Sequence, residues 1–149
     1  MDDQQAPSVG TGMLIRSPAA EVFEAFVDPA ITTRFWFTRG SGRLVPGAQV
    51  QWDWEMYGVS VPVDVKAVEP ATRIAVEWPG DAGPTTIEWR FTAQSASSTY
   101  VAISCTGGDV AAQATDLVEG FALVLAGLKA LLEHGIQLNL VGDRFPSGI

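Results

Sequence analysis

The sequence predicts an α+β fold in which a curved antiparallel β-sheet wraps around a long C-terminal helix. From about residue 47 to residue 105, apolar and polar side chains alternate with a period of two, which is typical of antiparallel strands with one buried face. From about residue 109 to residue 139, the apolar residues recur at helical spacing, which predicts one long amphipathic helix. Two shorter segments with helical spacing follow a first strand, so we expect two short helices there.

The first strand is predicted over residues 11–16, and a helix follows it directly. Ser17 is expected to cap that helix and Pro18 to take its first position, with an acidic residue in the first turn. Residues 28–30, with the sequence DPA, are expected to stop this helix and to start the second one, which ends near Phe35. The apolar residues of the first helix are Val22, Phe23, Phe26 and Val27.

The alternating segment predicts a meander of five strands joined by short turn sequences. Pro62 lies inside one of these strands, which predicts an edge or bulge position because proline has no amide donor. The last strand covers residues 100–105 and alternates less regularly. The residues expected on the apolar faces of the other four strands are Val50, Trp52, Trp54 and Met56; Val59, Val61, Val63 and Val65; Ile74, Val76 and Trp78; and Ile87, Trp89 and Phe91.

The long final helix is expected to cover the apolar face of the sheet. Gly120 and Gly127 are seven residues apart, almost one above the other, and would let this helix approach its neighbour closely. We expect one domain over residues 10–141, with a loose tail at residues 1–9 and another at residues 142–149. The apolar stripe of the helix consists of Leu117, Phe121, Val124, Leu128, Leu131 and Leu132.

The composition of the sequence argues against several classes of protein. The net charge of −8 disfavours nucleic-acid binding and attachment to anionic membranes, because both need clustered Lys and Arg. Cys105 is the only cysteine, so the chain has no internal disulfide. The N-terminus lacks the pattern of a secretion signal, and no apolar run approaches the ~20 residues that span a bilayer. We therefore expect a soluble cytoplasmic protein with no nucleic-acid or membrane partner.

Four ordered motifs carry a resemblance to a known superfamily. They are SPAAEVFEAFVDPAITTRFW, LVPGAQVQWDW, VKAVEPATRIAVEW and EGFALVLAGLKALLEHG, and together they extend from about Ile15 to Ile136. The chain resembles the START-like (SRPBCC, birch-pollen-allergen-like) helix-grip superfamily, and within it the branch similar to the activator of heat shock protein 90 ATPase. Phe121 stands where that branch commonly has tryptophan, which removes an indole N–H donor.

The side chains that usually carry catalysis are scarce in this sequence. His134, the only histidine, is expected near the C-terminal end of the last helix, where a cation suits the helix dipole. Cys105 is expected to fill space in the core. Asp64 becomes a candidate acid or base only if a bulge at Pro62 turns it inward. We therefore predict no catalytic residue, no metal site and no cofactor.

Tryptophan and phenylalanine side chains are the strongest functional candidates. For each residue taken singly, packing in an aromatic core is the plainer interpretation. Taken together, so many flat side chains between a bent sheet and one helix could leave a gap. The resemblance implies that such a gap is a cavity for lipids, polyketides or other apolar molecules. The candidate ligand-binding residues are Phe26, Trp36, Trp52, Trp54, Val63, Val76, Trp78, Trp89, Phe121 and Leu125.

The sequence RFWFTRG, residues 34–40, places three aromatic side chains in a row, so we expect one of them to lie near water. One interpretation is a gate at the cavity mouth, with Trp36 and one phenylalanine pointing inward and the other on the rim. Arg34 and Arg39 would then reach water or an acidic head group of a ligand. The other interpretation is a buried corner with two solvated arginines.

Three functions remain open at this point. The first is binding of a hydrophobic small molecule, such as a lipid, polyketide or aromatic metabolite, without catalysis. The second, implied by the resemblance, is a chaperone-associated interaction protein. The third is an enzyme of the cyclase or hydrolase kind, with Asp64 as its least unfavourable candidate. Exposed strand edges would also allow a homodimer.

Overall fold

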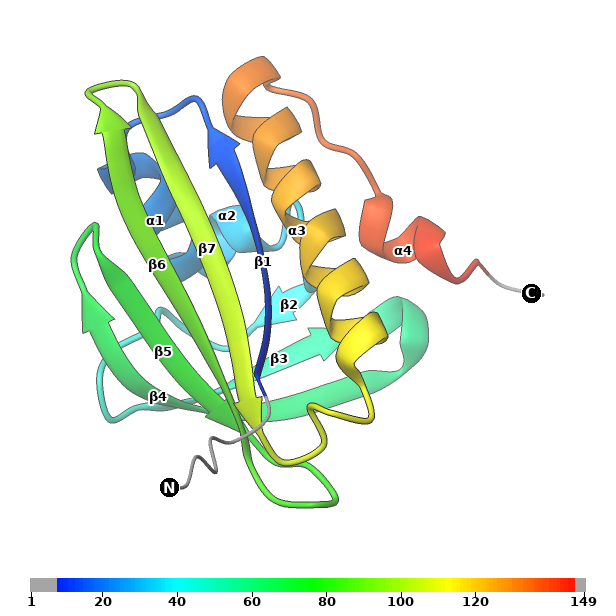
Figure 1. The fold of residues 1–149 in the computed structure, drawn as a ribbon. Helices are drawn as coiled ribbons and strands as arrows, with labels where there is room; N and C mark the ends of the chain where they lie inside the picture. Colours follow the sequence, from blue (N-terminus) through cyan, green and yellow to red (C-terminus); the bar gives the residue numbers. More distant parts are fainter. Residues whose placement is uncertain (1–7, 147–149) are drawn as a thin grey trace.

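The computed structural model describes residues 8–146, which form a curved antiparallel sheet and four helices (Figure 1). The strands are β1 (Ser8–Ile15), β2 (Arg39–Gly40), β3 (Gln49–Trp54), β4 (Val59–Glu69), β5 (Arg73–Trp78), β6 (Thr85–Ser95) and β7 (Ser98–Gly107). The helices are α1 (Ala19–Val27), α2 (Pro29–Thr32), α3 (Ala114–His134) and α4 (Leu140–Arg144), with a 3₁₀ turn η1 (Glu55–Tyr57) between β3 and β4. The strand order is β1-β7-β6-β5-β4-β3-β2. The predicted helix-grip fold class is confirmed.

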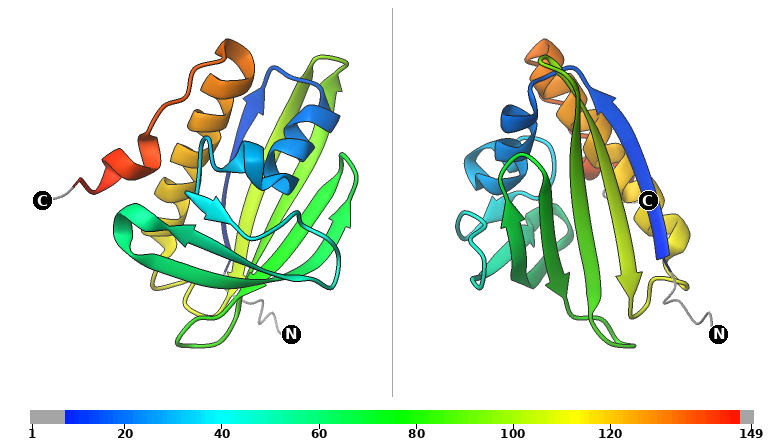
Figure 2. Two further views of the ribbon diagram at one scale, coloured as in Figure 1. Left: turned by 180° about the vertical axis from the view of Figure 1, so that it is seen from behind. Right: turned by 60° about the vertical axis from the view of Figure 1, so that its left-hand side comes forward.

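The core lies between the inner face of the sheet and α3, and α1 closes one end of it (Figure 2). The alternating residues predicted for β5 and β6 do face inward: Ile74, Val76, Ile87 and Trp89 are all buried. Each large apolar side chain moved from water into such a core stabilises the fold by about 1.5–3 kcal/mol. No helix among residues 8–146 is long and apolar enough to cross a membrane.

Strand β1 starts at Ser8, three residues before the predicted start, because its first residues pair with the end of β7, Ser8 opposite Thr106. Residues 1–7 of the predicted N-terminal tail lie outside the described part of the chain. Along its other side, β1 contacts α3. The Nζ of Lys129 donates to the carbonyl of Leu14 at 2.8 Å, and the amide of Arg16 donates to the Glu133 carboxylate at 2.8 Å.

The prediction of an edge or bulge at Pro62 holds for the edge and not for the bulge. Strand β4 as a whole lies inside the sheet, but its ladder with β5 does not extend to Pro62, and its bulge falls between Val65 and Ala67. Pro62 lies opposite Gln51, whose backbone amide and carbonyl bond to Ser41 instead. On the other side, β5 ends at Trp78, before the ladder would reach Pro62. The missing amide donor therefore breaks no ladder hydrogen bond.

Two other local predictions were also wrong. Ser17 does not cap α1: its hydroxyl donates to the Glu21 carboxylate at 3.2 Å, and Pro18 itself takes the cap position. Met56 does not continue the apolar face of β3. The strand ends at Trp54, and the chain then turns through η1, which leaves Met56 exposed.

The DPA sequence at residues 28–30 separates α1 from α2 as predicted. The backbone amide of Asp28 still bonds back to α1, while its carboxylate accepts a hydrogen bond from the amide of Ala30 at 2.9 Å. Pro29 begins α2, where the lack of an amide donor costs nothing.

Helix α3 is shorter than the predicted segment of residues 109–139 at both ends: it begins at Ala114, and Gly135, which adopts a left-handed conformation with φ 64°, ends it. The chain then crosses to α4, which lies partly inside the predicted C-terminal tail of residues 142–149 (Figure 1). Residues 147–149 of that tail lie outside the described part of the chain.

Candidate functional site

A hollow of about 410 Å³ lies between the sheet, α3 and α4, and it is open to solvent on one side. Four groups of residues surround it. They come from the turn after α2, from the segment between β3 and the start of β6, from α3 with the segment before it, and from α4 with Phe145 after it. Most of the lining is apolar, and much of it is aromatic. The lining residues used below are Trp36, Trp54, Tyr57, Trp78, Thr85, Asp109, Gln113, Asp116, Gly120, Phe121, Val141, Arg144 and Phe145.

Four aromatic side chains form the walls of the hollow. Trp36 contacts Phe121 of α3 with ring centroids 5.5 Å apart, and Trp54 of β3 with centroids 6.1 Å apart. Trp78 at the end of β5 lies nearly parallel to Phe121, at 9° and 6.5 Å between centroids. Trp54 and Trp78 are only half-buried, so each leaves part of its ring available to a guest. The sheet and the helix thus present flat apolar surfaces to the same space.

These four residues, Trp36, Trp54, Trp78 and Phe121, are also the sequence-predicted ligand-binding residues that the structure places around the hollow. The other six lie away from it, because the middle of each strand packs against α1, α2 or the buried side of α3. Some of them surround only a void with no room for a water molecule. The six core residues are Phe26, Trp52, Val63, Val76, Trp89 and Leu125.

The RFWFTRG segment does not place an aromatic side chain near water. Phe35, Trp36 and Phe37 are all buried. Phe35 packs edge-on against Phe26 of α1, with centroids 5.4 Å apart, and Phe37 stacks on Trp52 of β3, with centroids 4.8 Å apart. The segment is therefore a buried corner, and Trp36 is its contribution to the hollow.

Neither of the two arginines of this segment lines the hollow. Arg34 lies at a separate, shallower groove, where its Nε donates to Gln137 at 3.5 Å. Arg39 is exposed on β2. Both arginines are exposed, as the buried-corner interpretation expected, and neither lines the hollow, because the turn after α2 directs only Trp36 toward it.

Sequence reasoning missed the residues that α4 and η1 bring to the rim. The hydroxyl of Tyr57 in η1 donates to the carbonyl of Val141 in α4, and it accepts from the amide of Phe145 at 3.3 Å. Val141, Arg144 and Phe145 line the hollow although they belong to or border the predicted tail. The apolar pair Leu140 and Val141 is the one local signal that could have suggested an ordered element there.

Arg144 is the only cationic side chain of the described residues that lines the hollow. Its guanidinium donates to Glu119 at 2.6 Å and to Asp116 at 3.4 Å, both on α3, and it stacks on the ring of Phe145 at 4.9 Å. With 17% of its side chain exposed, it is mostly covered by these contacts. Its charge is thus already compensated within the protein.

The other polar lining groups lie where β7 leads into α3. Asp109 accepts a hydrogen bond from the amide of Ala82 at 3.1 Å, and the buried Thr85 and the exposed Gln113 lie at the same end of the hollow. The hollow therefore has aromatic walls, polar groups where β7 leads into α3, and the compensated charge of Arg144 beside α4.

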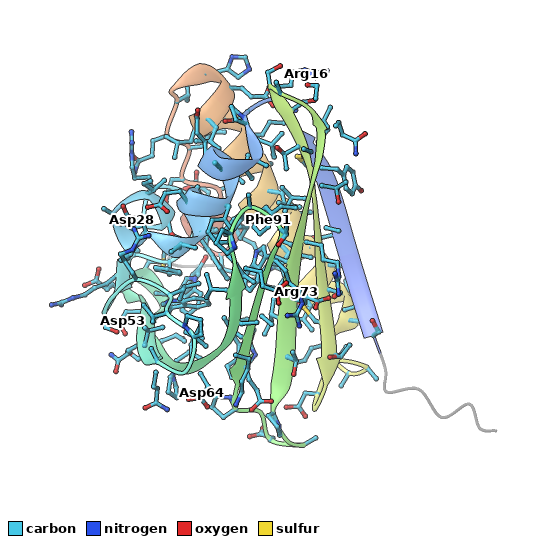
Figure 3. The ribbon with its side chains drawn as sticks, turned by 90° about the vertical axis from the view of Figure 1, so that its left-hand side faces the viewer. Arg16, Asp28, Asp53, Asp64, Arg73 and Phe91 are labelled. Atoms are coloured by element: carbon cyan, nitrogen blue, oxygen red, sulfur yellow. The ribbon has the colours of Figure 1, made fainter. Side chains whose placement is uncertain are left out.

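None of the three side chains considered for catalysis lines the hollow. Asp64 lies on the outer side of β4, where Gln49 donates to it at 3.0 Å (Figure 3). His134 is exposed at the end of α3. Cys105 is buried in the core, and burial raises the pKa of its thiol to about 11. Residues 8–146 contain no cluster of three His, Cys, Asp or Glu side chains that could hold a metal ion.

Comparisons with known proteins place the fold. The sequence profile of the family described as Activator of Hsp90 ATPase homolog 1-like protein matches residues 16–133. The protein SSP2350 from Staphylococcus saprophyticus has a similar structure, with 30% sequence identity and a TM-score of 0.77, and the match covers 89% of this chain and 96% of that one.

Two further solved structures are similar in fold alone. One is DynU16, a protein of the dynemicin biosynthetic locus, with 23% identity and a TM-score of 0.78, covering 87% of this chain and 48% of that one. The other is the Aha1 dimer from Colwellia psychrerythraea, with 17% identity and a TM-score of 0.71, covering 87% and 98%. No curated protein matches the chain.

Proposed function

Because this chain belongs to the Activator of Hsp90 ATPase homolog 1-like protein family of the START-like superfamily, we propose that it binds an apolar small molecule in the hollow between the sheet and α3. The observation that carries the proposal is the hollow itself. Its volume of about 410 Å³ lies within the ~300–1,000 Å³ typical of small-molecule sites, and its walls are mostly apolar with a few polar groups.

The aromatic walls suggest how a ligand would be held. Trp36, Trp54, Trp78 and Phe121 offer flat surfaces from four different elements, and a lipid chain or an aromatic metabolite would displace water from all of them. Because the core beneath is closely packed around Trp52 and Trp89, the walls would change little on binding.

Native mass spectrometry of the freshly purified protein tests this proposal first. An added mass that is lost on denaturation identifies a non-covalent ligand. The matched variants are Trp54→Ala, which removes a wall of the hollow, and Trp52→Ala, which removes a core residue two positions away. We expect Trp54→Ala to lose the added mass while it stays folded. Retention of the ligand by a folded Trp54→Ala protein would contradict the proposed site.

The family gives a second candidate function, a role in partnership with a chaperone, because it takes its name from an activator of the Hsp90 ATPase. The fold is also that of the Colwellia Aha1 dimer, so a protein partner or a second copy of the chain belongs to this candidate. Retention of the protein on the immobilised host chaperone at low salt would support it. Loss of all retention under those conditions would count against it.

A further inference from the structure

The charges around the hollow are unequal, and they limit the kind of ligand that fits. Three charged side chains of the described residues line it, namely Asp109, Asp116 and Arg144. Arg144 is held by Asp116 and by the neighbouring Glu119. A ligand with a carboxylate would therefore meet no available cation in this part of the chain, and it would have to approach two or three negative charges.

Asp109 differs from Asp116 in its surroundings. It is half-buried in the connection between β7 and α3, and no Lys or Arg within residues 8–146 forms an ion pair with it. Its Oδ1 accepts a hydrogen bond from the amide of Ala82 at 3.1 Å. A carboxylate can accept about four hydrogen bonds in all, so Asp109 retains acceptor capacity.

Gly80 lies directly beside Asp109 and also lines the hollow. A Cβ at Gly80 would lie 2.7 Å from Oδ2 of Asp109, so a larger residue there would crowd the carboxylate. Trp78 precedes it by two residues, and its half-buried ring faces the same hollow. A carboxylate and an aromatic face that line the same hollow attract an ammonium group, the first through ion pairing and the second through cation–π attraction.

We propose that the hollow is selective for an apolar, ring-containing molecule that carries a protonated amine, and that Asp109 is the residue that selects it. This inference rests on the proposed function and deepens it by naming the class of ligand. The rings of Trp36, Trp54 and Phe121 contact the apolar body, while the amine lies beside Asp109 and Trp78.

Three probes with one naphthalene skeleton test the inference: 2-naphthylmethylamine, 2-naphthalenemethanol and 2-naphthoate, each titrated calorimetrically at pH 7 in low salt. We expect affinity to fall in that order, with the amine at least about fivefold tighter than the alcohol, the size of a single partly exposed charge interaction. Raising the salt concentration to about 0.5 M should weaken binding of the amine and leave binding of the alcohol unchanged.

The variant Asp109→Asn should bind the amine only as tightly as the alcohol, and its affinity for the alcohol should equal that of the wild-type protein. Asp81→Asn is the matched control, because Asp81 lies in the same turn region as Ala82 but does not line the hollow. Asp109→Glu keeps the charge and should keep the preference, which separates an electrostatic role from a structural one.

The outcomes distinguish this inference from the proposed function. Equal binding of amine and alcohol by the wild-type protein, with no salt dependence, overturns the ligand class but leaves a working apolar site. A preference that persists in Asp109→Asn overturns the role of Asp109. If no probe binds the wild-type protein while native mass spectrometry finds a ligand without an amine, the inference fails and the proposed function stands. If no probe binds and no added mass is found, both are contradicted.

Discussion

The hydroxyl of Tyr57 in η1 donates a hydrogen bond to the backbone carbonyl of Val141 in α4, and this contact joins two segments that are 84 residues apart in the chain. The same hydroxyl accepts from the amide of Phe145, and the two rings meet edge-on at 6.2 Å. Together with the contact of Arg144 with Glu119, the Tyr57 side chain holds the short C-terminal helix over the hollow.

Replacing Tyr57 with phenylalanine should loosen α4 and leave the sheet intact. The loss of a hydroxyl that makes two backbone hydrogen bonds should cost about 1 kcal/mol. Because the contact is local, we expect faster hydrogen exchange at residues 141–145 than in the wild-type protein. Tyr100→Phe, on the exposed face of β7, is the control. Unchanged exchange in α4 would show that Tyr57 does not hold it.

Trp52 and Trp54 should differ strongly in their contribution to stability. Trp52 is fully buried between Phe37 and Trp36, so Trp52→Ala should lower the free energy of unfolding by about 3–5 kcal/mol. Trp54 is half-buried beside the hollow, so Trp54→Ala should lower the free energy of unfolding by less than half as much as Trp52→Ala. Urea unfolding measures both. Equal losses would mean that the two residues belong to one core.

Two glycines of α3 should respond in opposite ways to substitution. A Cβ at Gly127 would lie 3.3 Å from the Cβ of Phe35, so Gly127→Leu should destabilise the protein by about 1–3 kcal/mol. A Cβ at Gly120 would meet only the end of the Arg144 side chain. Gly120→Ala should therefore stabilise the helix by up to about 1 kcal/mol. Thermal unfolding would contradict this account if both variants shifted in the same direction.

Ionisation of Glu133 should make the free energy of unfolding depend on pH in the acid range. Burial raises the pKa of Glu133, whereas hydrogen bonds from Lys129 and from the amide of Arg16 lower it. The lowering effects together are larger, so the pKa lies below its ordinary value of 4.5. A lowered pKa in the folded state means that the contribution is present above about pH 4.5 and is lost as the pH falls through the folded pKa.

The variant Glu133→Gln should therefore be less stable than wild type at pH 7 by about 1–2 kcal/mol, and the difference should shrink toward pH 3. Glu55→Gln, at an exposed position in η1, is the control. A difference that stays constant from pH 7 to pH 3 would show that ionisation of Glu133 does not contribute.

Cys105 should be unreactive in the folded protein. It is 2% exposed, and its thiol pKa of about 11 leaves roughly one molecule in a thousand as thiolate at pH 8. A disulfide reagent such as Ellman's reagent should modify it only after denaturation. Rapid modification at pH 8 without denaturant would mean that β7 opens locally.

The sheet and the long helix could be predicted because their signals are local. The period-two alternation in β5 and β6 fixes which residues face the core, and the apolar stripe of α3 fixes its buried side. The burial of Phe35, Trp36 and Phe37 could not be predicted in the same way. After α2 the chain turns so that three consecutive rings are all buried, Phe35 against Phe26 and both Trp36 and Phe37 against Trp52, and periodicity does not describe such a turn.

The candidate site was predicted only in part, for a similar reason. Trp54, Trp78 and Phe121 follow from strand and helix periodicity, because each lies on a face that the pattern assigns to the interior. Arg144 and Phe145 do not, because α4 reaches the hollow through contacts with Tyr57 and Glu119, which are far away in sequence. A cytoplasmic location, also expected from the sequence, stays a prediction.

The contact between β1 and α3 has a consequence for assembly. A sheet normally recruits another chain through the free main-chain groups of its outermost strands. Here one outermost strand, β2, has only two residues, and the other is partnered along its outer side by α3 through Lys129 and Glu133. A second copy of this protein could not pair with the main-chain groups at Leu14 and Arg16 unless α3 moved away, so an association of copies at this end of β1 would have to use side-chain surfaces instead of backbone hydrogen bonds.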